Sequence, residues 1–371
     1  MSADLSDLLS DYHFELPDDL IAQEPSHRRD DARLLVVRRA PEKGLPRFED
    51  LQIKDLPQLV SETPLLKNSL WLRNRSRVLP ARFYARRPSG SRHEIVLLEE
   101  KSAGIWTALM RNSAKMSFPQ ELLIDGLPEG VVERVVVPEA GIVDIRNLSI
   151  PISTLLSQVG EMPLPPYIRS REAKRDHDRY QPVWALDGQD KSVAAPTASL
   201  HFTPELVASL QGAGVEFADA ILHVGLGTFE PVRCEKLSEH TLHDERFFVG
   251  ASDLARLEKQ VRENKPILCV GTTALRTLES LPLAGQAIRG EVRCEKNPDG
   301  SLSGRTHIFV KPDFEFRYTQ ALLTNFHLPE STLFVLLARF AGSRALAREA
   351  YAHAVEKRYR FFSYGDASLW I

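Results

Sequence analysis

Ile267-Leu268-Cys269-Val270-Gly271-Thr272-Thr273 decides the fold, because a short apolar run meets a glycine turn there. The apolar run predicts a buried strand, and the residues that follow, through Glu279, predict a helix. Such a turn presents backbone N–H groups and a helix N-terminus, which suit a carboxylate or a phosphate. Plain capping of the helix is the alternative interpretation.

The same alternation of strand and helix continues on both sides of this stretch. Residues 220–224 predict a strand that leads into a Gly-x-Gly turn, and residues 252–263 predict a helix. Upstream, Thr203 with Pro204 predicts the start of a helix. Alternating strands and helices favour an α/β sheet that binds ligands at the carboxyl ends of its strands.

Residues 69–150 have a different sequence pattern, with short β-rich runs separated by Ser-Gly, Pro and Asp-Gly turns. The runs cover residues 70–72, 78–84, 93–98, 105–110, 131–137 and 141–145. This spacing is typical of a small antiparallel sheet or barrel. We therefore expect an α/β fold, α+β overall, with an α/β main domain (residues 1–62 and 151–371) and an inserted small antiparallel β-barrel domain (residues 63–150).

Length and composition indicate a globular protein of about two domains. The 371 residues exceed the roughly 150 expected per domain, and the hydrophobic and charged fractions are ordinary for soluble proteins. No window contains 18 apolar residues, and the acidic start lacks the features of a signal peptide. We therefore expect a cytoplasmic protein without a membrane span. Three separated cysteines predict neither a disulfide framework nor a metal knuckle.

Arginine is unevenly distributed, although the net charge is −3. Between Arg73 and Arg92 there are five further arginines and no acidic residue, and a second cluster lies between Arg169 and Arg179. Such patches could follow a phosphate backbone, because each Lys or Arg placed against a phosphate releases a counterion. A solvated arginine-rich face is the alternative interpretation.

Two polar-aromatic strings, residues 324–333 and 359–366, follow neither the strand period nor the helix period. Segments of this kind indicate a site rather than a packed core. A third string of small residues, 194–202, ends near His201, which could exchange protons near neutral pH. His240 and His243 lack a third ligand at a recognisable spacing, so no metal site is predicted.

These strings, together with residues 160–168, 179–181, 193–198, 222–229 and 271–273, resemble the S-adenosylmethionine:tRNA ribosyltransferase-isomerase family of the queuosine pathway. The similarity runs in order from Phe14 to Asp366. It implies an α/β domain with an inserted β-barrel domain, in agreement with the short β-rich runs of residues 69–150.

The resemblance implies transfer of the ribosyl part of S-adenosylmethionine to 7-aminomethyl-7-deazaguanine at the wobble position of tRNA. Adenine and methionine leave, and the ribose becomes an epoxycyclopentanediol. The reaction needs a base near the sulfonium, polar groups that assist departure of adenine, and a pocket for the methionine carboxylate. S-adenosylmethionine is then a co-substrate, no prosthetic group or metal is expected, and a monomer is the working expectation.

The resemblance also implies candidate site residues. The catalytic candidates are His201, His223, Glu230 and His243, with Glu245 as a further titratable group. The substrate-binding candidates are Asn74, Arg77, Arg82, Tyr167, Arg179, Tyr180, Thr197, Gly225, Gly227, Thr228, Thr272, Thr273, Arg276, Asn325, His327 and Tyr364.

Four residues depart from the family pattern: Ser199 in place of Gly, Arg75 in place of Asn or Asp, Asp244 in place of Ser, and Asp313 in place of Gly. A positive φ would strain Ser199, and the new charges bear on which acceptor is used. Two alternatives therefore stay open. One is a divergent paralogue acting on another deazapurine, and the other is a catalytically silent tRNA-binding protein.

Overall fold

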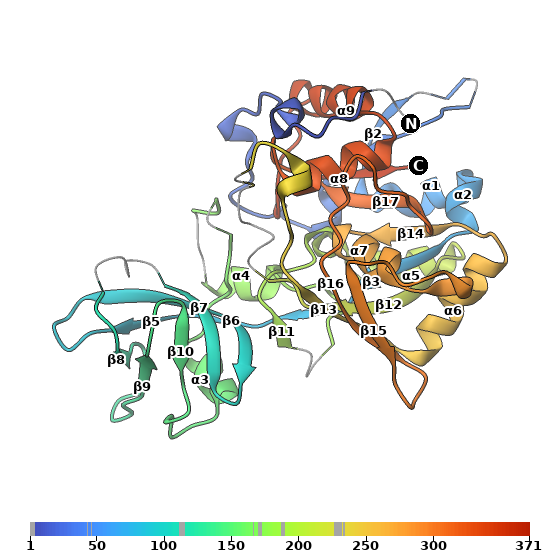
Figure 1. Ribbon diagram of the computed structural model, residues 1–371. Helices are drawn as coiled ribbons and strands as arrows, with labels where there is room; N and C mark the ends of the chain where they lie inside the picture. Colours follow the sequence, from blue (N-terminus) through green and yellow to red (C-terminus); the bar gives the residue numbers. More distant parts are fainter. Residues whose placement is uncertain are drawn as a thin grey trace.

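The computed structural model describes residues 4–371 except residues 43, 46, 111–115, 166, 170–172, 187–189, 226–231 and 233. A large mixed sheet flanked by helices lies beside a closed barrel (Figure 1). This arrangement confirms the predicted α/β architecture with a β-barrel.

The large sheet contains ten strands in the order β15-β16-β13-β12-β3-β14-β17-β18-β1-β2. Their bounds are β1 (Arg33–Val37), β2 (Phe48–Gln52), β3 (Leu70–Asn74), β12 (Glu216–Leu222), β13 (Glu245–Val249), β14 (Ile267–Val270), β15 (Val292–Lys296), β16 (Leu302–Thr306), β17 (Thr319–Asn325) and β18 (Ala367–Trp370). The four central strands β12, β3, β14 and β17 run parallel, so their carboxyl ends meet at one edge.

Helices cover both faces of this sheet, which is why β14 is fully buried. Ile267 and Cys269 face the helices α6, α7 and α8, whereas Leu268 and Val270 face α1 and α5. The helix bounds are α1 (Leu56–Glu62), α2 (Pro64–Lys67), α3 (Ile152–Val159), α4 (Ala173–Arg179), α5 (Pro204–Gly212), α6 (Ala251–Arg262), α7 (Thr272–Ser280), α8 (Thr332–Ala341) and α9 (Arg344–Glu356). As predicted, Thr203 caps α5 by accepting from the Leu206 N–H.

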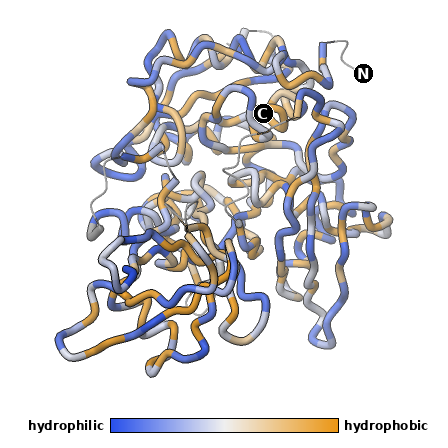
Figure 2. The backbone as a smooth tube through the Cα atoms, turned by 60° about the vertical axis from the view of Figure 1, so that its left-hand side comes forward, coloured by the Kyte–Doolittle hydropathy of each residue, from blue (hydrophilic) through white to orange (hydrophobic). Residues whose placement is uncertain are grey.

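The barrel closes in the order β10-β7-β6-β5-β8-β9. Its strands are β5 (Arg82–Arg86), β6 (Arg92–Ser102), β7 (Ile105–Met110), β8 (Gln120–Ile124), β9 (Arg134–Val137) and β10 (Ile142–Asp144). Alternate residues such as Phe83 and Ala85 fill the interior, and Leu155 of α3 packs onto the same core. Figure 2 shows the resulting alternation of apolar and polar segments along the barrel strands.

One strand lies where the sequence did not place it. Residues 70–72 were expected in the barrel domain, but β3 pairs with β12 and β14 in the middle of the large sheet. The reason is burial on both faces, since Trp71 and Leu72 are both inaccessible to solvent. The short strand β4 (Arg77–Val78) pairs with β11 (Asp190–Ser192) between the sheet and the barrel. Strand pairing does not define folding units, so the domain limits at 63 and 150 stay a prediction.

A buried carboxylate joins α7 to the start of β17. Glu279 has no exposed surface, and it accepts hydrogen bonds from the backbone N–H groups of residues 317, 318 and 319 and from the Thr319 hydroxyl. Arg289 pairs with the same carboxylate at 3.4 Å. Because β17 leads directly into the string 324–333, this contact helps to position that string.

We expect Glu279→Ala to lower the free energy of unfolding by about 3–5 kcal/mol, because it leaves buried donors and Arg289 without their acceptor. Urea denaturation measures the change. The matched control is Glu263→Ala, which removes an exposed carboxylate paired with Lys265 and should change the stability far less, because water screens an exposed ion pair. Similar losses in the two variants would contradict the structural role of Glu279.

Candidate active site

A cavity of about 200 Å³ lies at the carboxyl ends of β14 and β17, and we call it the central cavity. All ten residues of the string 324–333 line it. The other lining residues are Tyr167, Ala194, Ala195, Pro196, Thr197, Ala198, Val224, Val232, Gly271, Thr272, Thr273, Phe362 and Ser363. Its place agrees with the general rule that open α/β sheets bind ligands outside the carboxyl ends of their strands.

The N-terminus of α7 forms one wall of the central cavity. Gly271 precedes the helix with φ +90°, a conformation that favours glycine, and no side chain caps the first turn. The Oγ1 atom of Thr273 is buried and has no hydrogen-bond partner among the described residues. The wall therefore presents donors and the positive end of the helix dipole, as the anion-binding interpretation of the sequence requires.

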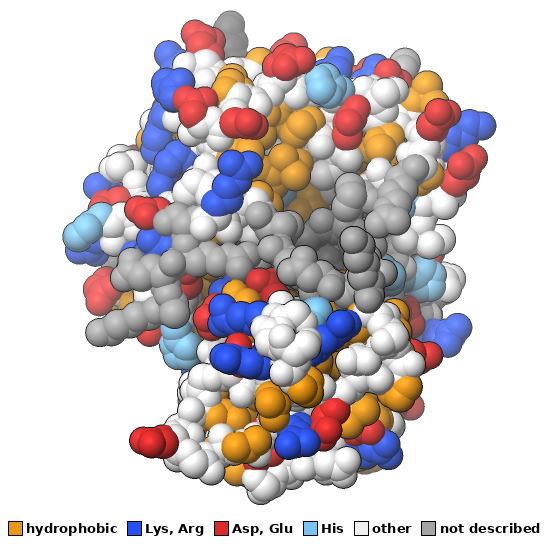
Figure 3. All heavy atoms as spheres, turned by 90° about the vertical axis from the view of Figure 1, so that its left-hand side faces the viewer, with side chains coloured by type: hydrophobic (Ala, Val, Ile, Leu, Met, Phe, Trp, Pro, Cys, Tyr) orange, Lys and Arg blue, Asp and Glu red, His pale blue; other side chains and the backbone are white. Residues whose placement is uncertain are grey.

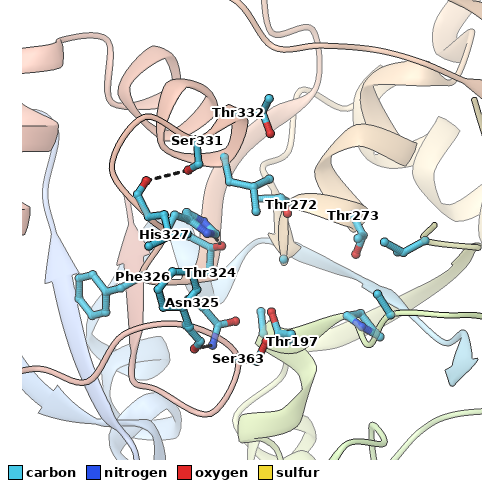
Figure 4. A pocket seen from close by; sticks show the side chains of 18 of the residues that line it. Thr197, Thr272, Thr273, Thr324, Asn325, Phe326, His327, Ser331, Thr332 and Ser363 are labelled. Atoms are coloured by element: carbon cyan, nitrogen blue, oxygen red, sulfur yellow. Dashed lines mark hydrogen bonds between the residues drawn. The ribbon is translucent and has the colours of Figure 1, made fainter. Parts of the chain in front are cut away.

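Asn325 forms the opposite wall, and its amide has a fixed orientation. Its Nδ2 donates to the Phe362 carbonyl at 3.1 Å and to His201 Nε2 at 3.2 Å. Because a carbonyl can only accept, the Oδ1 atom must lie on the other side of the amide. Asn325 is 2% exposed, and its Oδ1 has no partner within the described part of the chain. Figure 4 shows the amide directed toward Thr197 and Ser363.

Two histidines at this site are held in the neutral form. Burial lowers the pKa of His327 to about 3, and burial, reinforced by Arg360 and Arg29, does the same for His201. His327 lines the cavity, and its Nε2 lies 3.0 Å from the Thr324 hydroxyl. His201 lies behind Asn325 and does not line the cavity. Neither ring stores a proton near neutral pH.

Aromatic side chains provide a flat surface in the same cavity. The rings of Tyr167 and Phe362 lie 4.2 Å apart between centroids at an angle of 31°. The Tyr167 hydroxyl contacts Ser363 Oγ at 2.6 Å, and burial raises the pKa of Tyr167, so the phenol stays neutral. Phe362 adopts φ +74°, a strained backbone conformation of the kind that clusters at functional sites.

Two further cavities adjoin the central one. The side cavity, of about 50 Å³, is lined by Gly225, Leu242, His243, Asp244, Glu245, Arg276, Ile308, Phe309, Val310, Thr332, Leu333 and Leu336. The barrel cavity, of about 340 Å³, is lined by Leu79, Leu98, Glu99, Glu100, Trp106, Ile152, Ser153, Leu156, His223, Val224, Gly225, Asp244 and Arg246.

The three cavities meet around the end of β12. Thr332 and Leu333 line both the central and the side cavity, Val224 lines the central and the barrel cavity, and Gly225 lines the side and the barrel cavity. Figure 3 shows a hollow in the middle of one face, with apolar side chains above it and Lys and Arg side chains below it. We call these three neighbouring cavities together the cleft, and its compartments differ in chemistry.

The cleft brings together about half of the residues expected from the sequence. Tyr167, Thr197, Thr272, Thr273, Asn325 and His327 line the central cavity; His243, Glu245 and Arg276 line the side cavity; His223 lines the barrel cavity, and Gly225 lines the last two. Gly227, Thr228 and Glu230 lie outside the described residues. Ser331, Thr332, Phe362 and Ser363 were not singled out, although they belong to the strings that indicated a site.

The remaining candidates line none of the three cavities. They are Asn74, Arg77, Arg82, Arg179, Tyr180, His201 and Tyr364. Several use their polar groups within the protein. Asn74 bonds the backbone of Leu222, Tyr364 donates to Asp176, and Arg179 donates to the carbonyls of residues 26 and 27. Tertiary contacts of this kind hold the site together without touching a ligand in it.

Several arginines of the cluster 73–92 pair with carboxylates of the protein. Arg73 and Arg75 both pair with Asp219, and Arg86 and Arg92 both pair with Asp125. Arg82 is buried and pairs with Glu161 at 2.5 Å, so it is not available to a phosphate. The sequence hides these pairs because the carboxylates come from distant segments.

The four departures from the family pattern have ordinary structural settings. Ser199 lies in a short 3₁₀ helix (Thr197–His201) and is not among the described residues with positive φ, so the expected strain is absent. Arg75 pairs with Asp219, and Asp244 contacts His307 at 3.3 Å. Asp313 is exposed.

Comparisons with known proteins find similar chains over nearly the whole length of this one. A family model described as queuosine biosynthesis protein matches residues 9–370. The S-adenosylmethionine:tRNA ribosyltransferase-isomerase of Thermosipho africanus is 42% identical over 362 residues, 97% of this chain and 98% of that protein. The Xylella fastidiosa protein of the same name is 41% identical over 365 residues, which cover 97% of this chain and 96% of that protein. A crystal structure of S-adenosylmethionine tRNA ribosyltransferase from Thermotoga maritima matches this chain with a TM-score of 0.51 and 32% sequence identity. The match covers 97% of this chain and 99% of that chain.

Among the described residues, no helix is long and apolar enough to cross a membrane. No cluster of three or more His, Cys, Asp or Glu side chains in that part of the chain could hold a metal ion.

The neutral state of His327 generates a prediction about stability and pH. Its pKa is about 3 in the folded protein and about 6.5 in the unfolded chain, so only the unfolded chain takes up the proton as pH falls below 6.5. This group therefore lowers the free energy of unfolding by roughly 1.4 kcal/mol per pH unit between pH 6.5 and 3. We expect His327→Gln to remove this contribution, which urea unfolding at a series of pH values measures. The control His177→Gln changes an exposed ring on α4 and should keep the original slope; an unchanged slope in the His327 variant would count against a neutral His327.

Proposed function

Because this chain belongs to the family of S-adenosylmethionine:tRNA ribosyltransferase-isomerases, we propose that the cleft at the end of β12 is where it performs the family reaction. The chain is a transferase-isomerase of queuosine biosynthesis. It transfers the ribosyl part of S-adenosylmethionine to 7-aminomethyl-7-deazaguanine in tRNA and isomerises it to epoxyqueuosine, with release of adenine and methionine. The tRNA substrate favours a cytoplasmic site of action.

The central cavity suits the adenosine part of S-adenosylmethionine. Asn325 Oδ1 is a buried acceptor that needs a donor, and the exocyclic amine of adenine supplies one. The Tyr167–Phe362 surface matches a flat purine. This single unsatisfied acceptor in a cavity at the carboxyl edge of the sheet is the observation that carries the proposal.

The N-terminus of α7 suits the departure of adenine. When the bond between ribose and base breaks, negative charge develops on the base. The open first turn of α7 and the Thr273 hydroxyl are fixed donors that face this cavity. Because they are already oriented, they stabilise the developing charge without rearrangement. His327 contributes as a neutral hydrogen-bonding group.

A base must also remove the acidic proton beside the sulfonium. We assign this role to His243, which is exposed at the side cavity next to Thr332 and Leu333, the residues shared with the central cavity. His201 is a positioning residue in this scheme, because it holds the amide of Asn325 from behind.

The barrel cavity suits the aminomethyl base of the tRNA. It adjoins the central cavity at Val224, so a base there can reach the ribose. Trp106 offers an aromatic surface, and its Nε1 donor has no partner among the described residues. A primary alkylamine is protonated at neutral pH, as lysine is, and the carboxylate of Glu100 at the cavity makes no ion pair with any described residue.

The direct test combines the purified protein, S-adenosylmethionine and tRNA that carries 7-aminomethyl-7-deazaguanine at the wobble position. We expect adenine, methionine and epoxyqueuosine-tRNA in equal amounts by mass spectrometry. If both substrates bind but adenine never appears, the chain is a silent tRNA-binding protein. If adenine appears only with another deazapurine acceptor, it is a divergent paralogue. No observation on the cleft favours either alternative.

His243→Gln should lower the turnover number by roughly 10²–10⁴-fold, the effect of losing a general base, while the Kd for S-adenosylmethionine stays within about threefold. Adenine release under single-turnover conditions measures it. His201→Ala should mainly weaken binding, because it loosens Asn325. If His201→Ala abolishes turnover and His243→Gln does not, the two roles are reversed.

Glu100→Gln should raise the KM for the modified tRNA by about two- to fivefold at low salt, because it removes a carboxylate facing the cationic amine. The matched control is Glu121→Gln, an exposed carboxylate on barrel strand β8 that pairs with Arg134 and lines no cavity of the cleft. Steady-state kinetics with both variants decide the point. A KM that rises equally in both variants would indicate that any carboxylate of the barrel has this effect, and not a specific contact between Glu100 and the amine.

A further inference from the structure

We propose that the side cavity binds the zwitterionic amino acid end of S-adenosylmethionine, with Arg276 as the residue that binds its carboxylate. This inference rests on the proposed function, because it concerns the same ligand. It adds that the amino acid end of S-adenosylmethionine enters the side cavity and that Arg276 binds the carboxylate.

Arg276 is a buried cation with one donor left over. It is 6% exposed, its Nη1 pairs with Glu245, and its Nε donates to the Ile308 carbonyl at 3.1 Å. Its Nη2 is buried and has no hydrogen-bond partner within the described residues. Leaving a charged donor unsatisfied in a buried place is costly, so the geometry favours an acceptor atom in the side cavity that Arg276 lines.

The charges of the side cavity select the kind of acceptor. Arg276 is already accompanied by Glu245, and Asp244, which also pairs with Arg305, lines the same cavity. A simple anion would be repelled by these carboxylates. An α-amino acid group carries its own ammonium beside its carboxylate, so it can face Arg276 and the two acidic residues together. The cavity is therefore complementary to a zwitterion.

The position of Arg276 on α7 connects the two compartments. Arg276 lies four residues after Thr272 and three after Thr273, so all three project from one face of the helix. The threonines line the central cavity, and Arg276 lines the side cavity. A ligand can follow this helix face if its adenosine occupies the central cavity and its methionyl chain passes Thr332 and Leu333 into the side cavity. Phe309 and Leu336 supply apolar surface for its methylene groups.

A tRNA phosphate is the other source of an anion, but it fits the side cavity poorly. A backbone phosphate must enter with chain on both sides, whereas the amino acid end of S-adenosylmethionine has chain on one side only. The experiment below separates the two sources.

The test measures the Kd of S-adenosylmethionine and of its decarboxylated analogue by calorimetry, without tRNA. We expect the unaltered protein to prefer S-adenosylmethionine by roughly 10- to 100-fold, the range of one charge-assisted hydrogen bond in a buried site. Arg276→Gln should lose most of this preference by weakening only the carboxylate-bearing ligand. Arg276→Lys, which keeps the charge but loses the fork geometry, should retain part of it.

The control is Arg289→Gln. Arg289 also pairs with a buried glutamate, Glu279, but lines none of the three cavities. It should lose stability in urea and keep the ligand preference. This comparison separates recognition of the carboxylate from a general loss of packing.

Three outcomes would overturn the inference. One is equal affinity of the unaltered protein for both ligands, which needs no variant to fold. Another is an equal loss of both ligands in Arg276→Gln, and a third is a loss of tRNA affinity in that variant with S-adenosylmethionine affinity unchanged. If the unaltered protein releases adenine normally but binds S-adenosylmethionine and its decarboxylated analogue with equal affinity, the proposed function stands and only this inference fails. Failure to bind either ligand would instead refute the proposed function.

Discussion

Parallel pairing of β12, β3, β14 and β17 is the constraint on which the site depends. Because these strands run in one direction and are covered on both faces, their carboxyl ends open at a single edge. The segments that leave this edge then converge. Thr272 after β14, Phe326 after β17 and Val224 after β12 meet at the central cavity although the sequence separates them.

The central and side cavities contrast with the buried carboxylate of Glu279 in how their polar atoms are satisfied. Both oxygens of the Glu279 carboxylate accept hydrogen bonds from donors within the protein. In the described part of the cleft, Asn325 Oδ1, Thr273 Oγ1 and Arg276 Nη2 lack partners. They are one acceptor and two donors on different walls. S-adenosylmethionine carries complementary groups at its two ends, so a bound substrate completes what the protein leaves open.

Charge is also divided among the compartments. The central cavity contains a neutral histidine, neutral hydroxyls and a helix N-terminus, which suit a departing base, and the carboxylate of Glu330, which also lines it, contacts His13 at 3.7 Å. The side and barrel cavities contain carboxylates beside Arg276 and Arg246, which suit ammonium groups. In the proposed function, the reaction takes place where the compartments meet, around Val224, Gly225 and Leu333.

The sequence alone determined the α/β class, the barrel and the string 324–333 as site lining, because periodicity, turn residues and local composition are properties of neighbouring residues. It did not determine that β3 belongs to the large sheet or that Arg82 is buried, since both depend on partners far along the chain. The settings of the histidines were likewise decided by tertiary structure. His201, His243 and His327 are chemically identical in sequence, and only burial and neighbours distinguish a buried ring behind Asn325, an exposed ring at the side cavity and a buried ring that lines the central cavity.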